Sequence, residues 1–290
     1  MLGHSRPWVT SVVCGENLAT GPPAPPVIVL AGDISIGYDD VGSGLPIAFV
    51  HGFPHNRSLW APQLGGLAAP CRALAFDLRG FGESSLVPPV SMDRYADDLA
   101  AALAVLGVHS TVIVGLSMGG YVAFALWRRH PTLVRGLVLA DTRAGADDEA
   151  ARGARRAMIA LAREKGAAAV ADRMIAGMVG KTTREKNPDL VEAMHRMMSR
   201  APVEGIAGAL EAMSARADST PTLATITVPT LIVVGEEDVL TPVGEARALQ
   251  AGIAGSRLEV IAGAGHVSNL ERPAAFNHVV SEFLTTLTSQ

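Results

Sequence analysis

The sequence is poor in cysteine and has no cluster of metal-binding residue types. Its 290 residues include only 2 cysteines, Cys14 and Cys71, which cannot build a disulfide framework. Two incidental thiols predict a reduced protein of the cytoplasm. The chain has no CxxC motif and no group of His, Cys and acidic residues at metal-ligand spacing. We therefore expect no metal ion.

Long apolar runs, aromatic residues and an excess of positive charge are also missing. No apolar run reaches the roughly 18 residues that a membrane span needs, so we expect no membrane partner. The net charge is −4 and aromatic residues make up 4%, which leaves neither a basic stripe nor a base-stacking surface for nucleic acid. The glycine-rich segment 80–84 matches neither GxxxxGK[ST] nor GxGxxG, so we expect no nucleotide cofactor.

The chain does have a hydrophobic content of 49% and an alternation of strand and helix patterns. We predict a hairpin of edge strands at 27–30 and 34–38, with a turn at 39–44. Further strands are predicted at 46–50, 72–76, 111–114 and 133–140, and helices at 58–68, 92–106 and 121–129. This alternation indicates an α/β fold with a mostly parallel central sheet and helices on both faces.

The alternation stops between residues 142 and 222, where we expect four helices and no strand. The predicted helices are 149–165, 167–178, 189–200 and 203–215. Seven of the 10 methionines fall in this segment: Met158, Met174, Met178, Met194, Met197, Met198 and Met213. Methionine fills irregular apolar space, so the segment is either a plain helical core or a lid over an apolar pocket.

The strand and helix pattern then returns, which defines the predicted domains. Strands are expected at 229–235 and 257–261, and helices at 242–251, with Thr241 as its N-cap, and at 272–287. Residues 27–141 and 223–290 would form one α/β core, and residues 142–222 a helical cap. Residues 1–26, with the run Gly21-Pro22-Pro23-Ala24-Pro25-Pro26, are predicted to be a flexible proline-rich leader.

The segment 111–131 has the pattern of a nucleophile elbow. An apolar β-branched run leads into Gly115-Leu116-Ser117-Met118-Gly119, and a helical pattern follows. A serine at so sharp a turn has a strained backbone, and side chains two positions away would collide with the strand and the helix. Glycine at both of these positions removes the collision, so we predict an exposed Ser117 hydroxyl at a helix start.

Two more residues at predicted strand ends can activate this serine. Sites in open α/β sheets lie at the carboxyl ends of the strands, where Asp238 and His266 are also expected. His266 can act as the base that removes the Ser117 proton, and Asp238 can orient the imidazole and stabilise its charged form. Asp141 also ends a strand and is the alternative acid, although Asp238 is preferred.

The same edge supplies donors for a developing negative charge. Acyl transfer needs two backbone N–H groups that face the oxyanion. We expect these to come from Met118, directly after the nucleophile, and from Phe53, in the loop after the strand at 46–50. His51 precedes Gly52 in that loop and is expected to hydrogen-bond the loop rather than to act in catalysis.

These motifs together resemble the α/β-hydrolase superfamily over about residues 27–288. They are HGFP at 51–54, DLRGFGES at 77–84, GLSMGG at 115–120, GEEDVLTP at 235–242 and GAGH at 263–266. The sequence is most similar to the capped serine esterase and lactonase branch, including 3-oxoadipate enol-lactonase-like and carboxylesterase proteins, and to cofactor-free haloperoxidases and perhydrolases. The resemblance implies a cap inserted after the sixth strand, and gives the roles above to Ser117, Asp238, His266, Phe53 and Met118.

The resemblance and the residues together predict a serine hydrolase that cleaves a small-molecule ester or lactone through an acyl-enzyme, without a cofactor. A serine at the elbow excludes the related enzymes that need a carboxylate there. Three alternatives stay open: a perhydrolase that accepts peroxide with the same triad, a hydrolase of C–C bonds, and a ligand receptor of this fold without turnover. The sequence fixes neither the acyl chain length nor the oligomeric state.

Overall fold

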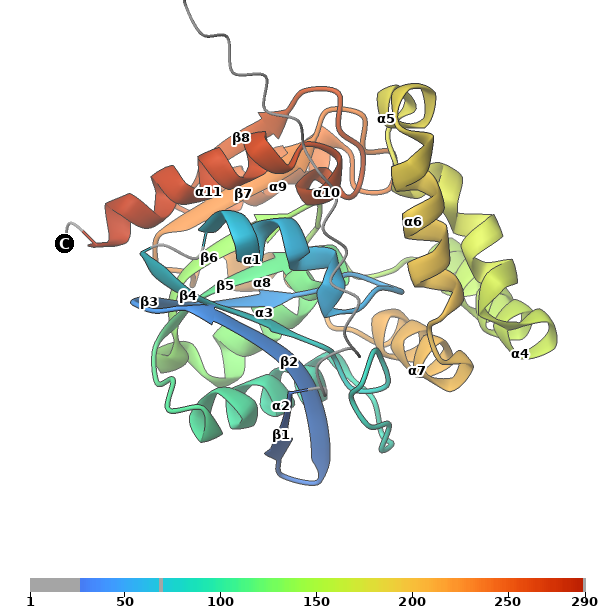
Figure 1. Cartoon of the computed structure of the whole chain (residues 1–290), viewed down its shortest axis with the longest axis horizontal. Coiled ribbons are helices and arrows are strands. Elements are labelled where there is room, and N and C mark those ends of the chain that lie inside the picture. The colour runs from blue at the N-terminus through green and yellow to red at the C-terminus, as the bar shows by residue number, and fades with distance from the viewer. Residues whose placement is uncertain (1–26, 68–69, 289–290) are drawn as a thin grey trace, which may run out of the picture.

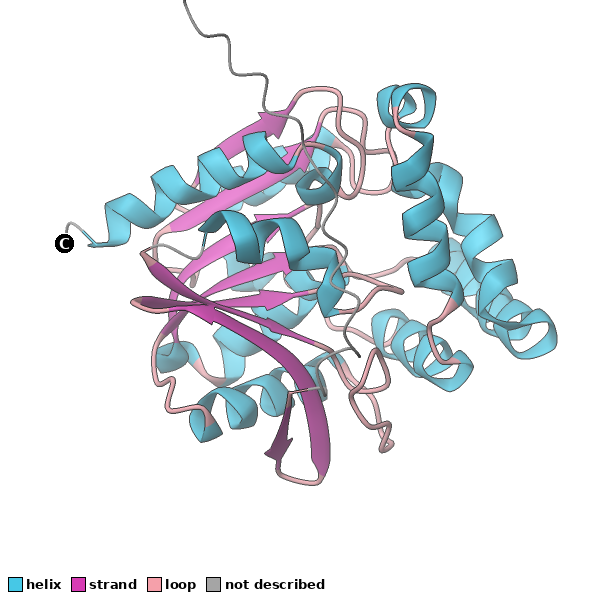
Figure 2. Ribbon diagram, viewed as in Figure 1, coloured by secondary structure: helices cyan, strands magenta, loops and turns pink. Residues whose placement is uncertain are grey.

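An eight-stranded sheet runs through the computed structural model, which describes residues 27–67 and 70–288. The predicted leader at 1–26, including Cys14, lies outside the described residues. The strand order is β1-β2-β4-β3-β5-β6-β7-β8 (Figures 1 and 2). The strands are β1 Ile28–Ala31, β2 Ile34–Gly42, β3 Leu45–Val50, β4 Cys71–Phe76, β5 Thr111–Leu116, β6 Val134–Ala140, β7 Thr230–Gly235 and β8 Arg257–Ile261.

All strands from β4 to β8 in this order pair in parallel, whereas β1 and β2 pair antiparallel. Every residue of β5 and of β7 is buried. Strands buried on both faces have continuous apolar sequences, as in Val112-Ile113-Val114. The predicted α/β sheet is therefore confirmed.

The first hairpin differs from the prediction in two respects. β2 is not an edge strand, because it lies between β1 and β4. The turn predicted at 39–44 is also wrong, since β2 continues to Gly42 and pairs with β4 as far as Arg72. The polar residues of this segment find partners across the strands: Asp40 accepts a hydrogen bond of 2.6 Å from Arg72 Nη2. The backbone therefore stays extended where a turn was predicted.

Helices cover both faces of the sheet (Figure 1). α1 (Ala61–Leu67) and α11 (Pro273–Thr288) pack on one face in a shared apolar cluster. α2 (Met92–Val105), α3 (Met118–Arg129) and α9 (Val243–Gly252) belong to the cluster of the opposite face. Short elements complete this part: the 3-10 turns η1 Arg57–Trp60 and η2 Pro131–Leu133, and α10 Ser268–Glu271.

A block of helices, here called the insertion (residues 142–222), follows β6 and precedes β7 in the sequence. It lies at one end of the sheet (Figure 1). It contains α4 Glu149–Met178, α5 Lys181–Lys186, α6 Pro188–Ser199 and α7 Val203–Ser214, whereas α8 Thr220–Leu223 crosses its end and contacts α9 of the core. The predicted break between the first two helices is present as a kink in α4 at Gly166, where φ is 80°. The short helices α5 and α8 were not predicted. The domain boundaries of the sequence analysis stay a prediction.

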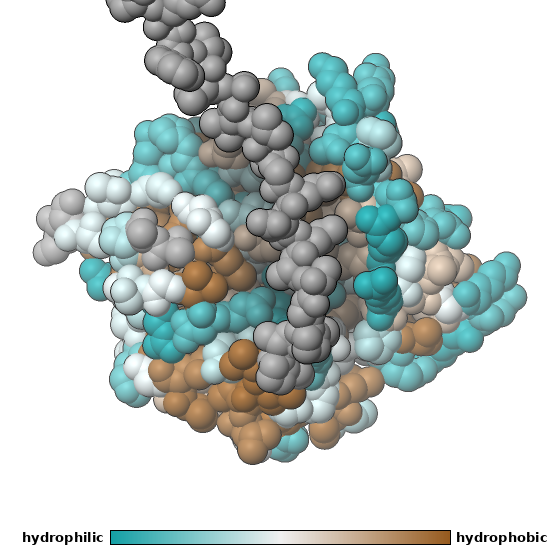
Figure 3. Space-filling view, viewed as in Figure 1, coloured by the Kyte–Doolittle hydropathy of each residue, from teal (hydrophilic) through white to brown (hydrophobic). Residues whose placement is uncertain are grey.

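The insertion turns its apolar residues inward. Met194 and Met198 of α6 are buried, whereas hydrophilic residues line the outward side of α5 and α6 (Figure 3). Hydrophobic residues gather instead where β1 lies, with Leu30 73% exposed (Figure 3). In the described part of the chain, no helix combines the length and apolar character that crossing a membrane requires.

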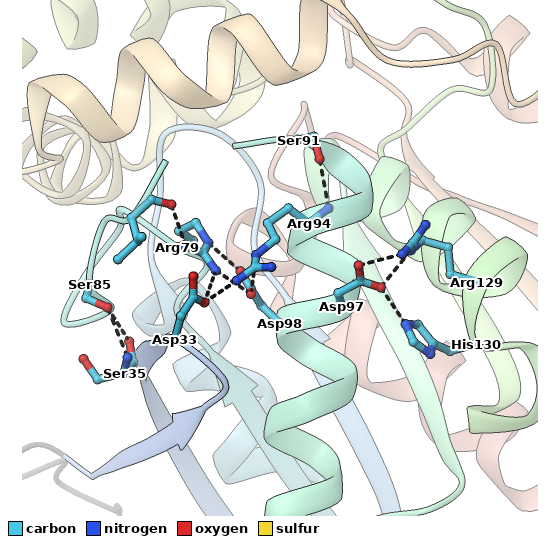
Figure 4. Close-up of polar contacts among 11 residues, drawn as sticks. Asp33, Ser35, Arg79, Ser85, Ser91, Arg94, Asp97, Asp98, Arg129 and His130 are labelled. Atoms are coloured by element: carbon cyan, nitrogen blue, oxygen red, sulfur yellow. Dashed lines mark hydrogen bonds and ion pairs between the residues drawn. The ribbon is translucent and has the colours of Figure 1, made fainter. Parts of the chain in front are cut away.

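Arg79, in the loop after β4, ties that loop to the first hairpin and to α2 (Figure 4). Its guanidinium is buried and donates hydrogen bonds of 2.7 Å to both carboxylate oxygens of Asp98. It also reaches Asp33, in the turn between β1 and β2, over 3.1 Å. This pairing of a buried charge with nearby carboxylates fixes the loop 77–84 beside the site described next.

Candidate active site

Ser117 lies at the sharp turn between β5 and α3, as the glycine pattern predicts. Its φ of 57° and ψ of −110° are unusual for a residue with a side chain. A Cβ at Gly119 would lie 2.2 Å from the Val50 carbonyl oxygen, and a Cβ at Gly115 would lie 2.3 Å from the Gly119 carbonyl oxygen. Both positions therefore need glycine, because any other side chain would overlap a backbone carbonyl oxygen. The turn is held from β6, because Ser117 N–H donates to the Ala140 carbonyl over 2.8 Å.

The structure brings Ser117, His266 and Asp238 into one hydrogen-bonded chain. His266 Nε2 lies 2.8 Å from Ser117 Oγ, and His266 Nδ1 lies 2.8 Å from Asp238 Oδ2. His266 is in the loop after β8 and Asp238 in the loop after β7, so the three residues meet at the carboxyl ends of three strands. Such a chain lets an imidazole take the serine proton while its other nitrogen stays oriented.

Asp238 is held by backbone and side-chain donors from the residues that follow it. Oδ1 accepts hydrogen bonds from the N–H groups of Leu240 and Thr241, at 2.8 and 3.0 Å. Oδ2 accepts a 2.6 Å bond from Thr241 Oγ1. Thr241 was predicted to cap α9; this is wrong, since the N-cap is Pro242 and no side chain caps the helix. The Thr241 hydroxyl bonds the carboxylate instead.

Asp141, the alternative acid, is buried at the end of β6 but makes different contacts. Its carboxylate accepts hydrogen bonds from Gly235 N–H over 2.8 Å and from Ser268 Oγ over 2.6 Å. Among the described residues, the carboxylate in hydrogen-bond contact with His266 is that of Asp238. Asp141 therefore braces the strand end that precedes Asp238 and the loop that follows His266.

Burial and neighbouring charges oppose each other in setting the pKa of His266 and of Asp238, whereas both raise the pKa of Asp141. Burial lowers the pKa of His266, but the negative charge of Asp238 and its hydrogen bond outweigh burial, so the pKa is raised. Burial likewise opposes ionisation of Asp238, yet His266 and Thr241 lower the pKa of its carboxyl. For Asp141, burial and then repulsion from Asp238 raise the pKa to about 8. Asp238 thus carries the negative charge while Asp141 keeps its proton near neutral pH.

The loop after β3 carries Phe53 to the same cavity as Ser117 and His266. His51 fixes this loop: its Nδ1 lies 2.8 Å from the Gly52 carbonyl oxygen, and its Nε2 accepts a 3.0 Å bond from Leu78 N–H. The predicted hydrogen-bonding role of His51 is therefore confirmed. Met118 is the first residue of α3, a position whose N–H has no acceptor within its own helix.

Ser117 opens into a cavity of about 200 Å³, here called the inner chamber. The core contributes Thr241 and His266 to its lining, and the insertion contributes Arg143, Arg155, Met174, Met178 and Met213. An outer chamber of about 370 Å³ shares Phe53, Arg155, Met174 and Leu240 with it. The insertion therefore walls the space in which a substrate would lie, and its methionines give that wall adaptable apolar side chains.

Two core glutamates hold the insertion beside the His266 loop. Glu271 accepts hydrogen bonds from Gly180 N–H over 2.9 Å and from Gly265 N–H over 2.8 Å. Glu237 accepts a 2.8 Å bond from Thr182 N–H and a second bond from the Thr182 hydroxyl. We call these contacts the glutamate clamp. It fixes the corner between α4 and α5 next to the predicted base.

The contacts of Thr241, Ser268 and Glu271 were missed by sequence reasoning. Their only sequence signal was proximity: Thr241 follows Asp238 by three residues, and Ser268 and Glu271 follow His266 by two and five residues. Residues close to a predicted site in sequence are candidates for holding it, but which of them face it depends on the loop path.

Comparison with known proteins identifies the family to which this fold belongs. A family model described as alpha/beta hydrolase fold matches residues 46–273. 3-Oxoadipate enol-lactonase 2 of Acinetobacter baylyi is 30% identical over 86% of this chain and 93% of its own length. A putative non-heme chloroperoxidase of a Synechocystis species is 31% identical over 87% and 95%.

A solved structure extends the similarity to three dimensions. A thermophilic esterase from Thermogutta terrifontis, in a structure with malate bound, superposes with a TM-score of 0.88. It is 37% identical in sequence, and the match covers 91% of this chain and 99% of that one. The family model alone spans well over half of the chain. The chain therefore belongs to the family with the alpha/beta hydrolase fold.

Proposed function

We propose that the protein is a serine hydrolase that cleaves carboxylic esters or lactones of modest size. The observation that carries the proposal is the hydrogen-bonded chain from Ser117 through His266 to Asp238, which opens into the inner chamber. The similarity to an enol-lactonase and to an esterase supports an ester-type substrate. The predicted location in the cytoplasm stays a prediction.

In the proposed reaction, Ser117 Oγ attacks the carbonyl carbon while His266 Nε2 takes its proton. The N–H groups of Phe53 and Met118 stabilise the oxyanion of the tetrahedral intermediate. The carbonyl then re-forms, the bond to the alcohol oxygen breaks, and the His266 imidazolium gives its proton to that oxygen. Water, deprotonated by His266, repeats the attack on the acyl-enzyme and releases the acid and Ser117.

The first test is hydrolysis of a 4-nitrophenyl ester series from acetate to decanoate. Turnover should fall by about 10⁴-fold or more in Ser117→Ala, because the proposed acyl-enzyme forms on the Ser117 hydroxyl. Turnover that survives this substitution would exclude the proposed nucleophile. The matched control is Ser256→Ala, since the Ser256 hydroxyl bonds only local carbonyls of the α9–β8 connection.

A perhydrolase is the second candidate, supported by the similarity to a putative chloroperoxidase. In that reaction peroxide takes the place of water in the attack on the acyl-enzyme. Assay of peracid formation from acetate and hydrogen peroxide, with Ser117→Ala as control, separates the two. Peracid formed faster than ester is hydrolysed would favour the perhydrolase.

A further inference from the structure

Three arginines from the insertion surround a single carboxylate beside the inner chamber. Asp147 has a fully buried side chain. Its carboxylate accepts hydrogen bonds from Arg143 Nη2 over 3.0 Å, from Arg216 Nη1 over 2.6 Å and from Arg155 Nη2 over 3.2 Å. Arg155 Nε makes a further bond to it. Within residues 27–67 and 70–288, no second carboxylate forms an ion pair with any of the three arginines.

The three arginines have different surroundings. Arg216 is 7% exposed and uses its guanidinium on Asp147, on the Met213 carbonyl and on the Gly145 carbonyl. It also lies 4.2 Å from the ring centroid of Tyr121. Arg216 is thus a structural counter-charge for Asp147. Although burial opposes it, hydrogen bonds from Arg155 and Arg216 lower the pKa of Asp147 to about 2, so this carboxylate stays ionised.

Arg143 and Arg155, in contrast, line the inner chamber together with Ser117 and His266. With the charge of Asp147 balanced by Arg216, these two guanidiniums leave a surplus of positive charge on the chamber wall. The Arg143 side chain interacts with that of Tyr121 as well as with Asp147, but its buried Nε has no hydrogen-bond partner among the described residues. Arg155 Nη1 meets only the weak acceptor Met213 Sδ, at 3.3 Å. Donors and charge are therefore available to a ligand.

Arg155 also occupies the boundary between the inner and outer chambers, since it lines both. A substrate group bound to Arg155 would lie away from Ser117, so the substrate must be long enough to reach from one to the other. Most other residues of the boundary are apolar, namely Phe53, Met174 and Leu240. Arg155 already bonds Asp147 through Nε and Nη2, so Nη1 is the nitrogen that remains for a ligand. A guanidinium binds carboxylate oxygens through charge-assisted hydrogen bonds, and the apolar residues of the boundary suit an aliphatic chain.

We infer that the substrate carries a free carboxylate, bound by Arg155 and Arg143, at the end of the chain remote from the scissile ester or lactone bond. This inference rests on the proposed function for the reaction at Ser117, but it concerns a separate part of the chamber. Binding energy from this remote carboxylate would position the carbonyl against Ser117.

A pair of esters that differ only in the remote group tests the inference. Monomethyl glutarate carries the carboxylate, and methyl pentanoate has a methyl group in its place; acid release from both is followed by titration at constant ionic strength, because salt screens the charge. The wild type should prefer monomethyl glutarate about tenfold or more in kcat/KM. Arg155→Gln should reduce that preference about tenfold, and Arg155→Lys should keep more of it.

Arg163→Gln is the matched control. Arg163 lies on the same helix, is exposed, and pairs with Glu204 outside both chambers. It should leave the preference unchanged. If Arg155 only supports the fold through Asp147, Arg155→Gln would slow both esters equally, and the inference would be overturned. Should Arg155→Gln fail to fold, the ratio of kcat/KM for the two esters is measured on Arg143→Gln. An unchanged preference for monomethyl glutarate in that variant would also overturn the inference.

Binding without turnover separates this inference from the proposed function. Glutarate and pentanoate are titrated calorimetrically into Ser117→Ala, which keeps both arginines. Tighter binding of glutarate, lost in Ser117→Ala with Arg155→Gln, supports the carboxylate site even if neither ester is hydrolysed. Equal binding of the two acids overturns the carboxylate site but leaves hydrolysis of neutral esters by Ser117 untouched.

Discussion

The carboxyl edge of the sheet and the insertion contribute to the same chamber with different kinds of residue. At the sheet edge, Ser117, His266 and Asp238 are connected by short hydrogen bonds, and glycine is required where backbones touch. The insertion contributes flexible methionines and two arginines, which line the chamber while they share Asp147 with Arg216. On the proposed function, the sheet edge would fix the geometry of the reaction, and the insertion would select the molecule that is accepted. Substitutions that affect one property and spare the other test this division.

The largest effect is expected at the acid of the sheet edge. Asp238→Asn should lower kcat by about 10³- to 10⁴-fold, because the amide can no longer stabilise the charged imidazole. Asp141→Asn should lower kcat by less than about tenfold at pH 7, since Asp141 is already protonated there. Steady-state hydrolysis of 4-nitrophenyl butyrate measures both. Equal losses of kcat in the two variants would contradict the assignment of Asp238, rather than Asp141, as the acid.

A substitution at the elbow should damage stability and activity together. Gly119→Ala places a Cβ 2.2 Å from the Val50 carbonyl oxygen, and the backbone must shift to remove the overlap. We expect the free energy of unfolding to fall by about 2–3 kcal/mol and kcat to fall by about 100-fold or more, because the shift displaces Ser117. Urea denaturation and ester kinetics report the two effects. A stable, fully active variant would mean that the turn is more adaptable than its contacts indicate.

The pH dependence of stability provides a third test, again at Asp141. Burial and repulsion from Asp238 raise its pKa to about 8 in the folded protein, well above the roughly 3.9 of an unfolded chain. The folded state therefore holds a proton that the unfolded state releases, so the contribution of Asp141 to stability is full below about pH 4 and is lost as pH rises to about 8. Asp141→Asn has no proton to lose. Its Tm relative to the wild type should increase between about pH 5 and pH 8.5; parallel Tm curves would contradict the raised pKa.

At the boundary between the two chambers, a substitution in the core loop after β7 should alter selectivity more than rate. Leu240 lies between the inner and outer chambers, and Leu240→Ala would widen the passage. The ratio of octanoate to butyrate hydrolysis should rise about threefold to tenfold. Val239→Ala is the matched control, because Val239 is 69% exposed and lines neither chamber. An unchanged ratio would show that Leu240 does not limit chain length.

The smallest effect is expected at a glycine of the insertion. The nearest atom to a Cβ at Gly153 is Arg156 Nη2, at an ordinary 3.7 Å. Since Gly153 lies within α4, Gly153→Ala should raise the free energy of unfolding by about 0.5–1 kcal/mol, in contrast to Gly119→Ala. Activity should be unchanged. A loss of stability comparable to that at Gly119 would remove the distinction between the two regions.

The sequence predicted the sheet edge better than the insertion for a physical reason. The elbow depends on neighbours within a few residues, such as Gly115 and Gly119, so its pattern is visible in the chain. Thr241 could cap a helix or bond Asp238, and only the path of the loop decides which. The ion pairs of Asp147 reach Arg216 across 69 positions and follow no periodic pattern. The six residues of α5 are too short to show an apolar period.

The glutamate clamp has a consequence for protein engineering. Glu271 bonds both Gly180 of the insertion and Gly265 of the His266 loop. A helical block transplanted from a homologous protein would therefore have to present a backbone N–H to Glu271 at the place where Gly180 does. The contact is made by backbone N–H groups, so many sequences could satisfy it provided that the incoming corner has the same backbone path and a residue as small as glycine at position 180. A Cβ there would lie 2.6 Å from Glu237 Oε2. Chimeras designed to exchange substrate range should therefore keep residues 179–182 with the recipient core.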